Sequence, residues 1–570
     1  MITTRVRTIV DVLRVRAEQD PDAVGYTFLE DGESETARLT YRELADLARA
    51  RAALLTERGL AGGRVLLAHP AGLEFVATLL GGMWAGVTTV PVPVPGNARA
   101  TDRLVRIARS AAATTVLTCG VGGDRLSGSG LTVIDTAATS AGGAGAPSPP
   151  NAAEVALLQY TSGSTGDPRG VMVTHANFVS NITKILDGWP CEPDSTVVSW
   201  LPHFHDMGLL LGVLLPLWAG VPTVLMPPSA FVRRPIRWLE AISRYAGTHS
   251  AAPSFAYELC VRAAEEGKVG PGLDLSSWRA AGNGAEPVRW QVLRSFVETF
   301  AGHGFRSAAM SPGYGLAEST LKVSSSGCDA EPAALWLSAE ALRAGRVEVR
   351  EPSTPGAQPI VACGAPANGT TVRMVDPATS AACRPGQVGE IWASSACVAA
   401  GYGGLPEESE RTFKARIAGE DKDFLRTGDL GFLHEGQLYV TGRLKDVIIR
   451  HGRNHYPQDI ELLAEAADGR LRPNCAAAFP VDDGTAERLV VVVEAENKVL
   501  REPGPDALRQ LIRDAVWAAH RLEVDEVLLT RRGAVPKTSS GKVRRRACRD
   551  LYLAGALPSA TAGKAGVSTA

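Results

Sequence analysis

The sequence lacks paired cysteines, a strong net charge and a signal-like start. Its nine cysteines are scattered, with no Cys-x-x-Cys pair and no regular spacing, so neither a zinc site nor a disulfide framework is indicated. A formal net charge of −2 argues against a protein that binds nucleic acid through bulk charge. Residues 1–16 mix arginine and aspartate with apolar residues and lack the continuous hydrophobic region of a signal peptide. These absences predict a protein of the reducing cytoplasm with no nucleic-acid partner.

Long hydrophobic runs are also rare, and one segment is the exception. Residues 207–226 contain twenty residues without a charge, which is long enough to span a bilayer. Pro216 and Pro222 would interrupt a membrane helix. We therefore expect a buried helix followed by a buried strand, and no stable membrane insertion.

The chain of 570 residues is too long for one ordinary core, so at least two domains are expected. Helical patterns at residues 39–57 and 73–84 alternate with short apolar runs at residues 65–67 and 88–94. Alternation of this kind predicts βαβ units around a mostly parallel sheet. Residues 120–150 are polar and low in complexity, which predicts a surface connection between two subdomains.

The residue composition changes twice in the second half of the chain. Residues 327–359 are polar and charge-rich, and we interpret them as an insertion with one short helix at residues 338–344. Glycine-rich, β-leaning sequence follows to about residue 440, and then a compact mixed segment. The predicted fold class is α/β: a large N-terminal domain of parallel-sheet α/β subdomains plus a β-rich part (residues 1–443), a small mobile α+β domain (444–553) and a disordered tail (554–570).

A segment rich in hydroxyls and glycines organises the chain. Residues 155–160 predict a short buried strand, and four hydroxyl side chains, three glycines and one arginine follow within ten residues. Glycines let backbone N–H groups approach a ligand, so this segment predicts a phosphate-holding loop. It is neither a Walker A loop nor a Gly-x-Gly-x-x-Gly turn. A flexible linker is disfavoured, because residues 171–175 open a new element at once. The candidate phosphate-binding residues are Thr161, Ser162, Gly163, Ser164, Thr165, Gly166 and Arg169.

This loop resembles the nucleotide loop of the adenylate-forming superfamily, which includes acyl- and aryl-CoA synthetases, luciferases, amino-acid adenylation domains and fatty acyl-AMP ligases. Most members have lysine where this chain has Arg169, a change that keeps the charge and alters the donor geometry. Six further segments resemble the family's motifs in the same order: residues 200–208, 282–289, 311–320, 426–431, 442–449 and 536–545. His-Asp-Met-Gly, Gly-Ala-Glu-Pro-Val-Arg, Gly-Leu-Ala-Glu and the polar insertion are similar to the fatty acyl-AMP ligase branch.

Taken alone, these segments allow plainer interpretations. His203, His205 and Asp206 are weak evidence for a metal site, since histidines two apart suit a strand better than a helical ligand pair. Residues 282–289 are a glycine-rich turn, and an aspartate in a turn usually caps the backbone. The basic residues near 542 could form a solvated tail or a nucleic-acid patch. Lysine is scarce in the chain, ten against 49 arginines, so its use at Lys542 suggests a specific role.

The resemblance implies a role for each motif residue. His205 would lie near the substrate carboxylate, and Gly284, Ala285 and Glu286 would cradle adenine. Tyr314 and Gly315 would form the adenine-stacking loop, with Glu318 directed at Mg²⁺. Asp429 and Arg443 would bind the ribose, Lys445 would be the hinge, and Lys542 the catalytic lysine. Ala317 stands where the general family pattern has threonine, in keeping with the acyl-AMP ligase branch.

The resemblance implies activation of a fatty or related carboxylic acid by ATP and Mg²⁺, with release of pyrophosphate. The acyl-adenylate would then pass to the phosphopantetheine thiol of an acyl carrier protein, for polyketide, lipopeptide or lipid biosynthesis. No Asp-Ser-Leu attachment site occurs in the tail, so we expect the carrier to be a separate chain. Residues 544–546 could help to dock it. The insertion would rest on the large domain and limit the swing of the small one.

Three alternatives remain open from the sequence. A fatty acyl-CoA synthetase would share the adenylation and release acyl-CoA, and an amino-acid adenylation enzyme would activate amino acids. A catalytically dead nucleotide sensor is disfavoured by the presence of Glu318, Asp429 and Lys542. Acyl chain length cannot be predicted.

Overall fold

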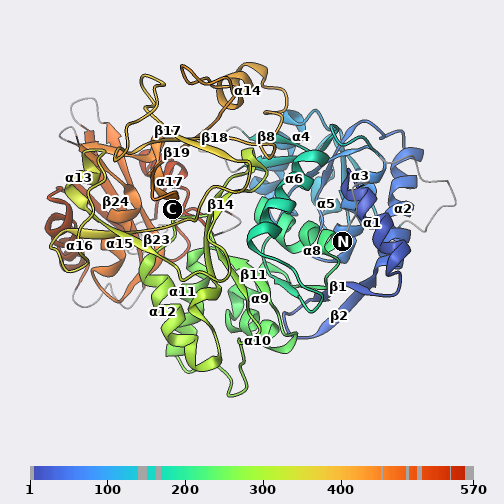
Figure 1. The fold of residues 1–570 in the computed structure, drawn as a ribbon, viewed down its shortest axis with the longest axis horizontal. Helices are drawn as coiled ribbons and strands as arrows, with labels where there is room; N and C mark the ends of the chain where they lie inside the picture. The colour runs from blue at the N-terminus through green and yellow to red at the C-terminus, as the bar shows by residue number, and fades with distance from the viewer. Residues whose placement is uncertain are drawn as a thin grey trace, which may run out of the picture.

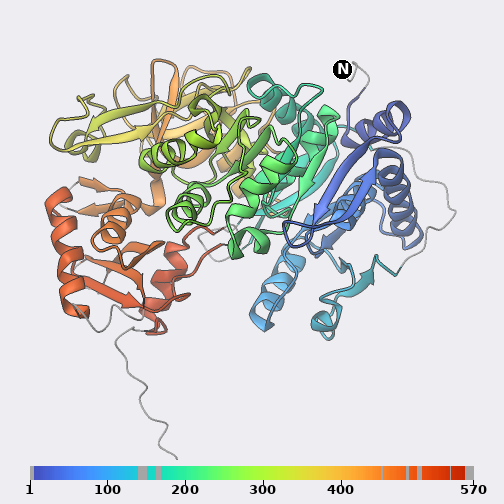
Figure 2. The same ribbon diagram turned by 90° about the horizontal axis from the view of Figure 1, so that it is seen from below.

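The computed structural model describes residues 6–138, 150–161, 168–450, 453–482, 487–496, 504–538 and 541–558. Two α/β layers and a β-rich part form the large N-terminal portion, and the C-terminal elements lie to one side of it (Figures 1 and 2). This mixed architecture confirms the predicted fold class.

The first layer is a six-stranded sheet in the order β6-β5-β3-β4-β7-β8. Its neighbours pair in parallel except for β7 and β8, which pair antiparallel. The predicted helix at residues 73–84 is α3 (Leu73–Trp84), and that at 39–57 is α2 (Tyr41–Glu57), which starts after a Thr40 cap. The strands are β3 (Arg64–Leu67), β4 (Thr88–Pro91), β5 (Thr115–Thr118), β6 (Thr132–Asp135), β7 (Val155–Thr161) and β8 (Arg169–Thr174).

The prediction for residues 120–150 was wrong in its described part. Residues 120–138 contain α5 (Gly123–Leu126) and β6, and β6 pairs in parallel with β5. Since β5 and β7 belong to the same sheet, the segment connects two strands of one sheet and does not join two subdomains. Only one of the four β6 residues is buried, so the strand has almost no hydrophobic signal.

The second layer is an eight-stranded sheet in the order β14-β13-β12-β11-β9-β10-β1-β2. Its central strands run parallel and its edge strands β2 and β14 antiparallel. The strands are β1 (Val24–Leu29), β2 (Glu35–Thr40), β9 (Val197–Ser199), β10 (Thr223–Leu225), β11 (His249–Ala252), β12 (Ala280–Asn283), β13 (Met310–Gly315) and β14 (Lys322–Ser325). Besides α2, α3 and α5, the two layers include the helices α1 (Ile9–Gln19), α4 (Ala98–Ser110), α6 (His175–Gly188), α9 (Pro228–Arg233), α10 (Ile236–Arg244), α11 (Ser254–Glu265) and α12 (Trp290–Phe300).

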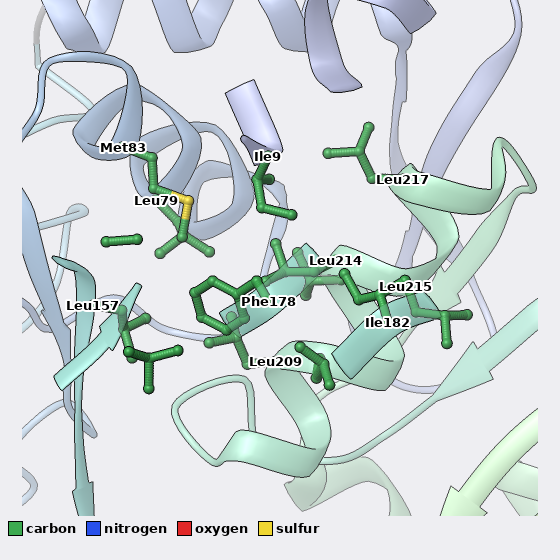
Figure 3. Packing of buried hydrophobic residues seen from close by; sticks show 14 of the residues in the cluster. Ile9, Leu79, Met83, Leu157, Phe178, Ile182, Leu209, Leu214, Leu215 and Leu217 are labelled. Atoms are coloured by element: carbon green, nitrogen blue, oxygen red, sulfur yellow. The ribbon is translucent and has the colours of Figure 1, made fainter. Parts of the chain in front are cut away.

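The uncharged segment at residues 207–226 is buried between these layers. It forms α7 (Asp206–Leu209), a π-helical turn (Leu210–Leu214), α8 (Leu215–Ala219) and then β10. Gly220 ends the helical run with a positive φ of 75°. Leu209, Leu214 and Leu217 pack with Phe178 of α6 in the main hydrophobic core (Figure 3). The prediction of a buried helix followed by a strand is confirmed, and no helix in the described ranges has the length and hydropathy to cross a membrane.

The β-rich part is a four-stranded antiparallel sheet in the order β17-β18-β19-β20, accompanied by α14 (Pro406–Phe413). Its strands are β17 (Thr371–Val375), β18 (Gly389–Ser394), β19 (Leu425–His434) and β20 (Gln437–Arg443). The elements after β20 are β21 (Ile448–Arg450), β22 (Arg453–His455), α15 (Pro457–Ala466), β23 (Leu471–Asp482), β24 (Glu487–Ala495), α16 (Pro505–His520), β25 (Glu526–Thr530) and α17 (Arg545–Leu553).

The elements after β20 have hydrophobic cores of their own. Two clusters consist of residues between 448 and 557, one on each side of the β23-β24-β25 sheet. The boundary at residues 443/444 stays a prediction that these separate cores support. Of the predicted tail, residues 554–558 are described, and the Thr530 hydroxyl donates to the Pro558 carbonyl oxygen at 2.6 Å. Residues 559–570 lie outside the described ranges.

The insertion is folded. Strands β15 (Ala334–Ser338) and β16 (Ala357–Val361) pair antiparallel around α13 (Ala339–Arg343), whose N-cap is Ser338. The predicted helix at residues 338–344 is thus confirmed. Leu337 and Leu342 share a cluster with Phe432 and Tyr439 of the β-rich sheet, with Tyr456 before α15, and with the partly buried Leu444 and Val447. The insertion therefore packs against both portions of the chain.

The backbone at Gly364 offers a test of the packing between β16 and β14. A Cβ at this position would lie 1.9 Å from the Ser325 carbonyl carbon, and φ is +75°. Gly364→Ala should lower the free energy of unfolding by about 2–5 kcal/mol through backbone strain and overlap. Gly356→Ala is the matched control, because Gly356 has φ +78° and nothing within 4 Å, so only the strain of about 1–2 kcal/mol applies. Denaturant unfolding measures both, and equal losses would contradict the packing described.

Candidate functional site

A cavity of about 830 Å³ lies where the two α/β layers, the β-rich sheet and the C-terminal elements meet. It brings together every predicted site residue that the structure describes: Thr161, Arg169, His205, Gly284, Ala285, Glu286, Tyr314, Gly315, Glu318, Asp429, Arg443, Lys445 and Lys542. Ser162, Gly163, Ser164, Thr165 and Gly166 lie outside the described residues. The strands that flank them, β7 and β8, form the antiparallel pair at the edge of the first sheet.

Asp429 is held by two groups from different elements. The Tyr314 hydroxyl at the end of β13 donates to Asp429 Oδ2 at 2.8 Å, and Arg443 Nε donates to Oδ1 at 3.0 Å. Asp429 and Arg443 are also register partners of β19 and β20. Only 6% of Asp429 is exposed, so its carboxylate is fixed in position and faces the cavity.

Glu318 and Arg169 form a second group. The Tyr402 hydroxyl donates to Glu318 Oε1 at 2.9 Å, and the Arg169 guanidinium lies 5.6 Å from the Tyr402 ring centroid. Arg169 also pairs with Glu408 of α14 at 2.7 Å. A planar guanidinium can stack on a ring and pair with a carboxylate at once, which explains how arginine is accommodated here.

Tight glycine contacts shape the two loops after β12 and β13. A Cβ at Gly315 would lie 1.7 Å from the Leu321 carbonyl oxygen, and one at Gly284 would lie 3.0 Å from that of Gly313. Ala285 has a φ of +66°, a conformation that L-residues adopt at a cost. Next to it, Glu286 Oε1 accepts a hydrogen bond from the Phe255 backbone N–H at 2.8 Å, and burial raises the pKa of the Glu286 carboxyl.

Lys542 reaches the cavity from the C-terminal side. Its loop is closed by hydrogen bonds from the Thr538 N–H to the Lys542 carbonyl at 2.7 Å and from the Lys542 N–H to the Thr538 hydroxyl at 3.0 Å. Burial lowers the pKa of the Lys542 ammonium, and the charges of Asp206, Glu286 and Asp429 oppose that shift. A half-buried cation that lines the cavity is placed to meet a phosphate or carboxylate ligand.

The two histidines His203 and His205 lie in different surroundings. His205 pairs with Asp206 at 2.6 Å and lines the cavity. Burial alone would raise the pKa of Asp206, but His205 and Lys542 outweigh it and the pKa lies below its usual value. His203 instead packs its ring against Phe75. Across the described ranges, no group of three or more His, Cys, Asp or Glu side chains could hold a metal.

The hinge candidate Lys445 lies on the short turn Leu444–Asp446 directly after β20. Burial and the charge of the neighbouring Arg443 together lower the pKa of Lys445 to about 8. Residues 544–546 were suggested to help to dock a carrier, and that suggestion stays a prediction, but Arg545 is already engaged within the chain. That side chain makes a two-pronged ion pair with Glu461 of α15 at 2.6 and 2.7 Å.

Three residues that line the cavity or hold its side chains were not predicted from the sequence. Tyr402 and Glu408 contact Glu318 and Arg169 from more than 80 positions away, and nothing in their local sequence distinguishes them. Asp206 stands inside a motif but was given no role. Of these three residues, only Asp206 could have been predicted from the sequence, because it immediately follows His205.

The sequence and the fold both match known proteins. The AMP-binding enzyme family matches residues 13–403, and the AMP domain of the Disco-interacting protein 2-like family matches residues 445–562. A medium-chain-fatty-acid–[acyl-carrier-protein] ligase, JamA of Moorena producens, is 43% identical over 96% of each chain.

The chain belongs to the AMP-binding enzyme family. The long-chain-fatty-acid–AMP ligase FadD26 of Mycobacterium marinum is 37% identical to this AMP-binding enzyme, covering 96% of this chain and 97% of the relative. A fatty acyl-adenylate ligase from Legionella pneumophila, solved in complex with acyl adenylate and pyrophosphate, matches with a TM-score of 0.76 and 38% identity over 98% of each chain. The architecture of this chain is thus that of fatty acyl-AMP ligases.

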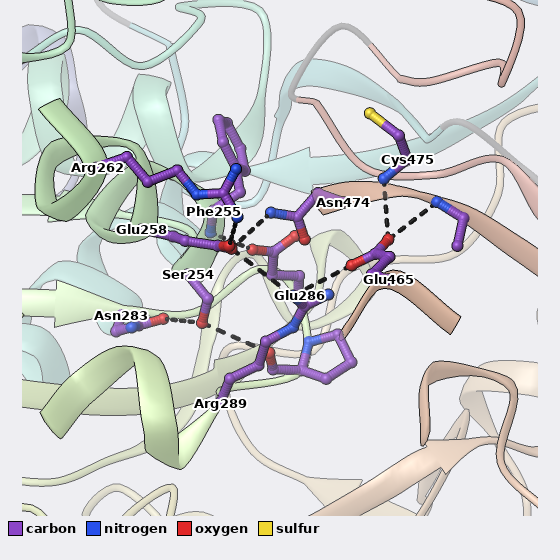
Figure 4. A network of polar contacts seen from close by, with 12 residues as sticks. Ser254, Phe255, Glu258, Arg262, Asn283, Glu286, Arg289, Glu465, Asn474 and Cys475 are labelled. Atoms are coloured by element: carbon purple, nitrogen blue, oxygen red, sulfur yellow. Dashed lines mark hydrogen bonds and ion pairs between the residues drawn. The ribbon is translucent and has the colours of Figure 1, made fainter. Parts of the chain in front are cut away.

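A polar network joins the glycine-rich turn at residues 282–289 to the C-terminal elements (Figure 4). Arg289, at the end of that turn, lies 3.8 Å from Glu258 of α11 and 4.0 Å from Glu465 of α15. Asn474 donates to Glu258 at 3.0 Å, and Glu465 Oε1 accepts from two backbone N–H groups of β23. The network connects the two portions of the chain beside the loop that carries Lys542.

Burial raises the pKa of Glu465 to about 7, although Arg289 opposes the shift. In the unfolded chain a glutamate ionises near pH 4.3. Between these values the folded protein binds the extra proton, so this group's contribution to the free energy of unfolding falls as pH rises toward 7.

Glu465→Gln removes that ionisation while keeping an oxygen that can accept hydrogen bonds. The free energy of unfolding of the variant minus that of the wild type should increase by on the order of 2–4 kcal/mol when the pH rises from 5 to 8. Denaturant unfolding at both pH values measures the difference. Glu266→Gln, at an exposed position, is the control and should follow the wild type. A Glu465→Gln profile parallel to the wild type would rule out the buried ionisation.

Proposed function

We propose that this AMP-binding enzyme activates a fatty acid with ATP to an acyl-adenylate, releases pyrophosphate, and transfers the acyl group to the phosphopantetheine thiol of an acyl carrier protein. The observation that carries the proposal is the convergence of Glu318, Asp429 and Lys542, from three separate parts of the chain, on one cavity. Two relatives named as acyl-carrier-protein ligases, one of them 43% identical, support the carrier as acceptor.

The site residues take the following roles in the proposal. Asp429, fixed by Tyr314 and Arg443, accepts hydrogen bonds from the ribose hydroxyls, since a carboxylate can accept two at once. Gly284, Ala285 and Glu286 line the adenine side with Tyr314 and Gly315. The loop at residues 161–169 holds the phosphates through Thr161, backbone N–H groups and Arg169.

In the first half-reaction a carboxylate oxygen of the fatty acid attacks the α-phosphorus of ATP. The bond to the bridging oxygen breaks, and pyrophosphate leaves with its electron pair. The enzyme needs no covalent nucleophile, because positioning and cations suffice. Lys542 stabilises the charge on the attacking carboxylate and the α-phosphate, and His205 lies beside the carboxylate. In the second half-reaction the carrier thiolate attacks the acyl carbon and AMP departs.

Glu318 suits a magnesium site completed by substrate. Mg²⁺ in nucleotide sites ordinarily takes one or two carboxylates, with phosphate oxygens and waters supplying the other ligands. Glu318 lines the cavity, and the Tyr402 hydroxyl at 2.9 Å orients its carboxylate. The ion would neutralise charge on the departing pyrophosphate.

The remaining cavity wall supports an acyl chain as substrate. Apolar side chains from four regions line it: Ile185, Trp189, Met207, Leu211, Leu321 and Val361. Trp189 Nε1 donates to the Ser311 hydroxyl at 2.8 Å, so its only polar atom is satisfied and the ring presents an apolar surface.

A second candidate is transfer to free coenzyme A, supported by a Mycobacterium tuberculosis relative that carries a fatty-acid–CoA ligase name and is 36% identical. The folded insertion favours the carrier. Its packing against Leu444, Val447 and Tyr456 would restrain movement at the hinge candidate Lys445.

Lys542→Ala tests the first half-reaction. Adenylation, measured as acid-dependent pyrophosphate exchange, should fall by about 10²–10³, as expected for loss of one charge-stabilising donor. Acyl transfer from supplied acyl-AMP should fall much less. Lys537→Ala is the matched control, because Lys537 belongs to the same loop but contacts Cys475 Sγ at 3.2 Å instead of the cavity. Equal loss in both half-reactions, or loss in neither, would refute the role of Lys542.

Removal of α13 tests the role of the insertion. Ser338 and Ala357 are the last register pair of β15 and β16, so an Asn-Gly turn can replace residues 339–356 and keep the hairpin. Adenylation should stay nearly intact, and acyl-CoA formation should rise from a low baseline by about tenfold for each 1.4 kcal/mol of restraint removed.

Arg453→Ala is the control for the insertion, since it removes only the ion pair with Glu340 of α13 at 3.5 Å. Exposed pairs of this kind contribute about 0–1 kcal/mol, so acyl-CoA formation should stay near the baseline. The restraint is disproved if the intact protein already makes acyl-CoA efficiently, or if the shortened one adenylates normally and makes none.

A further inference from the structure

Helix α4 carries four arginines on one face. Arg99, Arg103, Arg106 and Arg109 follow helical spacing, and Leu104, Ile107 and Ala108 on the opposite face are buried. Arg99, Arg106 and Arg109 are exposed, whereas Arg103 is partly buried and lines the main cavity. Asp102 is the one acidic residue of the helix, so the face is strongly cationic. The residues that line a groove beside α4 include Arg106, Arg109 and Arg125, together with the single acidic residue Asp102.

This face lies next to the entrance that the C-terminal elements share with the large portion. In Figure 2, α4 projects from the first layer on the same side as those elements. Burial lowers the pKa of Arg103, and the charges of Arg544 and Arg106 act in the same direction. Arg544 and Arg546 line the same cavity. Cationic side chains from both portions of the chain therefore line the same cavity.

The cationic face has no matching acidic partner in the described part of the chain. No ion pair there joins Arg99, Arg103, Arg106 or Arg109 to a carboxylate. Guanidinium groups this close repel one another, so an anionic surface placed on them would be favourable. Arg103 alone could meet a nucleotide phosphate inside the cavity. Arg99, Arg106 and Arg109 are not among the cavity residues, and their charge requires a ligand that approaches from outside.

We propose that the arginine face of α4 is the docking surface for the acyl carrier protein, which presents acidic side chains and the phosphodiester of its phosphopantetheine arm. The inference rests on the proposed function, because it names the surface by which that acceptor is recognised. Docking here directs the arm past Arg103 and Arg544 into the cavity. Guanidinium groups suit a phosphodiester, since they pair with two of its oxygens at once.

The test is the charge-reversal variant Arg99→Glu/Arg106→Glu, assayed with a phosphopantetheinylated acyl carrier protein. The kcat/KM for acyl transfer to the carrier should fall by on the order of tenfold or more, because reversed charges at an interface slow association. Pyrophosphate exchange without the carrier should match the wild type. Transfer by the wild type should weaken as salt rises, and the variant should lose this dependence.

Two further variants distinguish an effect of the charge on docking from an effect of the substitutions on folding. Arg99→Lys/Arg106→Lys keeps the charge and should retain most of the transfer. Arg42→Glu/Arg58→Glu makes the same change in net charge at exposed positions of α2 and its C-terminal end, and should transfer as the wild type does.

An unchanged kcat/KM for the carrier in Arg99→Glu/Arg106→Glu would overturn the inference, as would an equal loss of pyrophosphate exchange. A wild type that adenylates fatty acids and acylates no carrier would instead contradict the proposed function.

Discussion

The charge balance around the half-buried Lys542 is the constraint on which the site depends. Removing a cation from water is costly unless opposite charges lie near it, and here the charges of Asp206, Glu286 and Asp429 act on Lys542 from three elements of the large portion. Asp429 is itself fixed by Tyr314 and Arg443. The ends of β12 and β13 and the middle of β19 must therefore converge for the C-terminal loop to dock. The same convergence leaves a cavity with a charged wall and an apolar wall.

Two sets of contacts between the large portion and the C-terminal elements hold the loop that carries Lys542 at the cavity. The insertion packs its apolar side chains against the segment after β20, while Arg289, Glu258, Asn474 and Glu465 form a polar network on another side. One contact is apolar and insensitive to charge, and the other contains a carboxyl whose pKa is raised to about 7. Their different physical character means that salt and pH act on only one of them.

Much of the fold could be predicted where local patterns are strong. The bounds of α3 were predicted without error, α13 was recognised by its pattern inside the insertion, and the strand predicted at residues 155–160 is β7. The strand β6 was missed because a short, mostly exposed edge strand carries no hydrophobic alternation. Tyr402, Glu408 and Glu465 were missed for another reason. Their partners are brought to them only by tertiary packing, and no local spacing encodes such contacts.

The central claim is that a carboxylate oxygen attacks the α-phosphorus of ATP. A fatty acid labelled with ¹⁸O in its carboxylate tests this directly, when it is incubated with the enzyme, ATP, Mg²⁺ and a carrier protein. Mass spectrometry should find one ¹⁸O atom in the released AMP and none in pyrophosphate, because the bridging oxygen of the adenylate stays with phosphorus when the thiol attacks the acyl carbon. Unlabelled AMP, or label in pyrophosphate, would contradict the account.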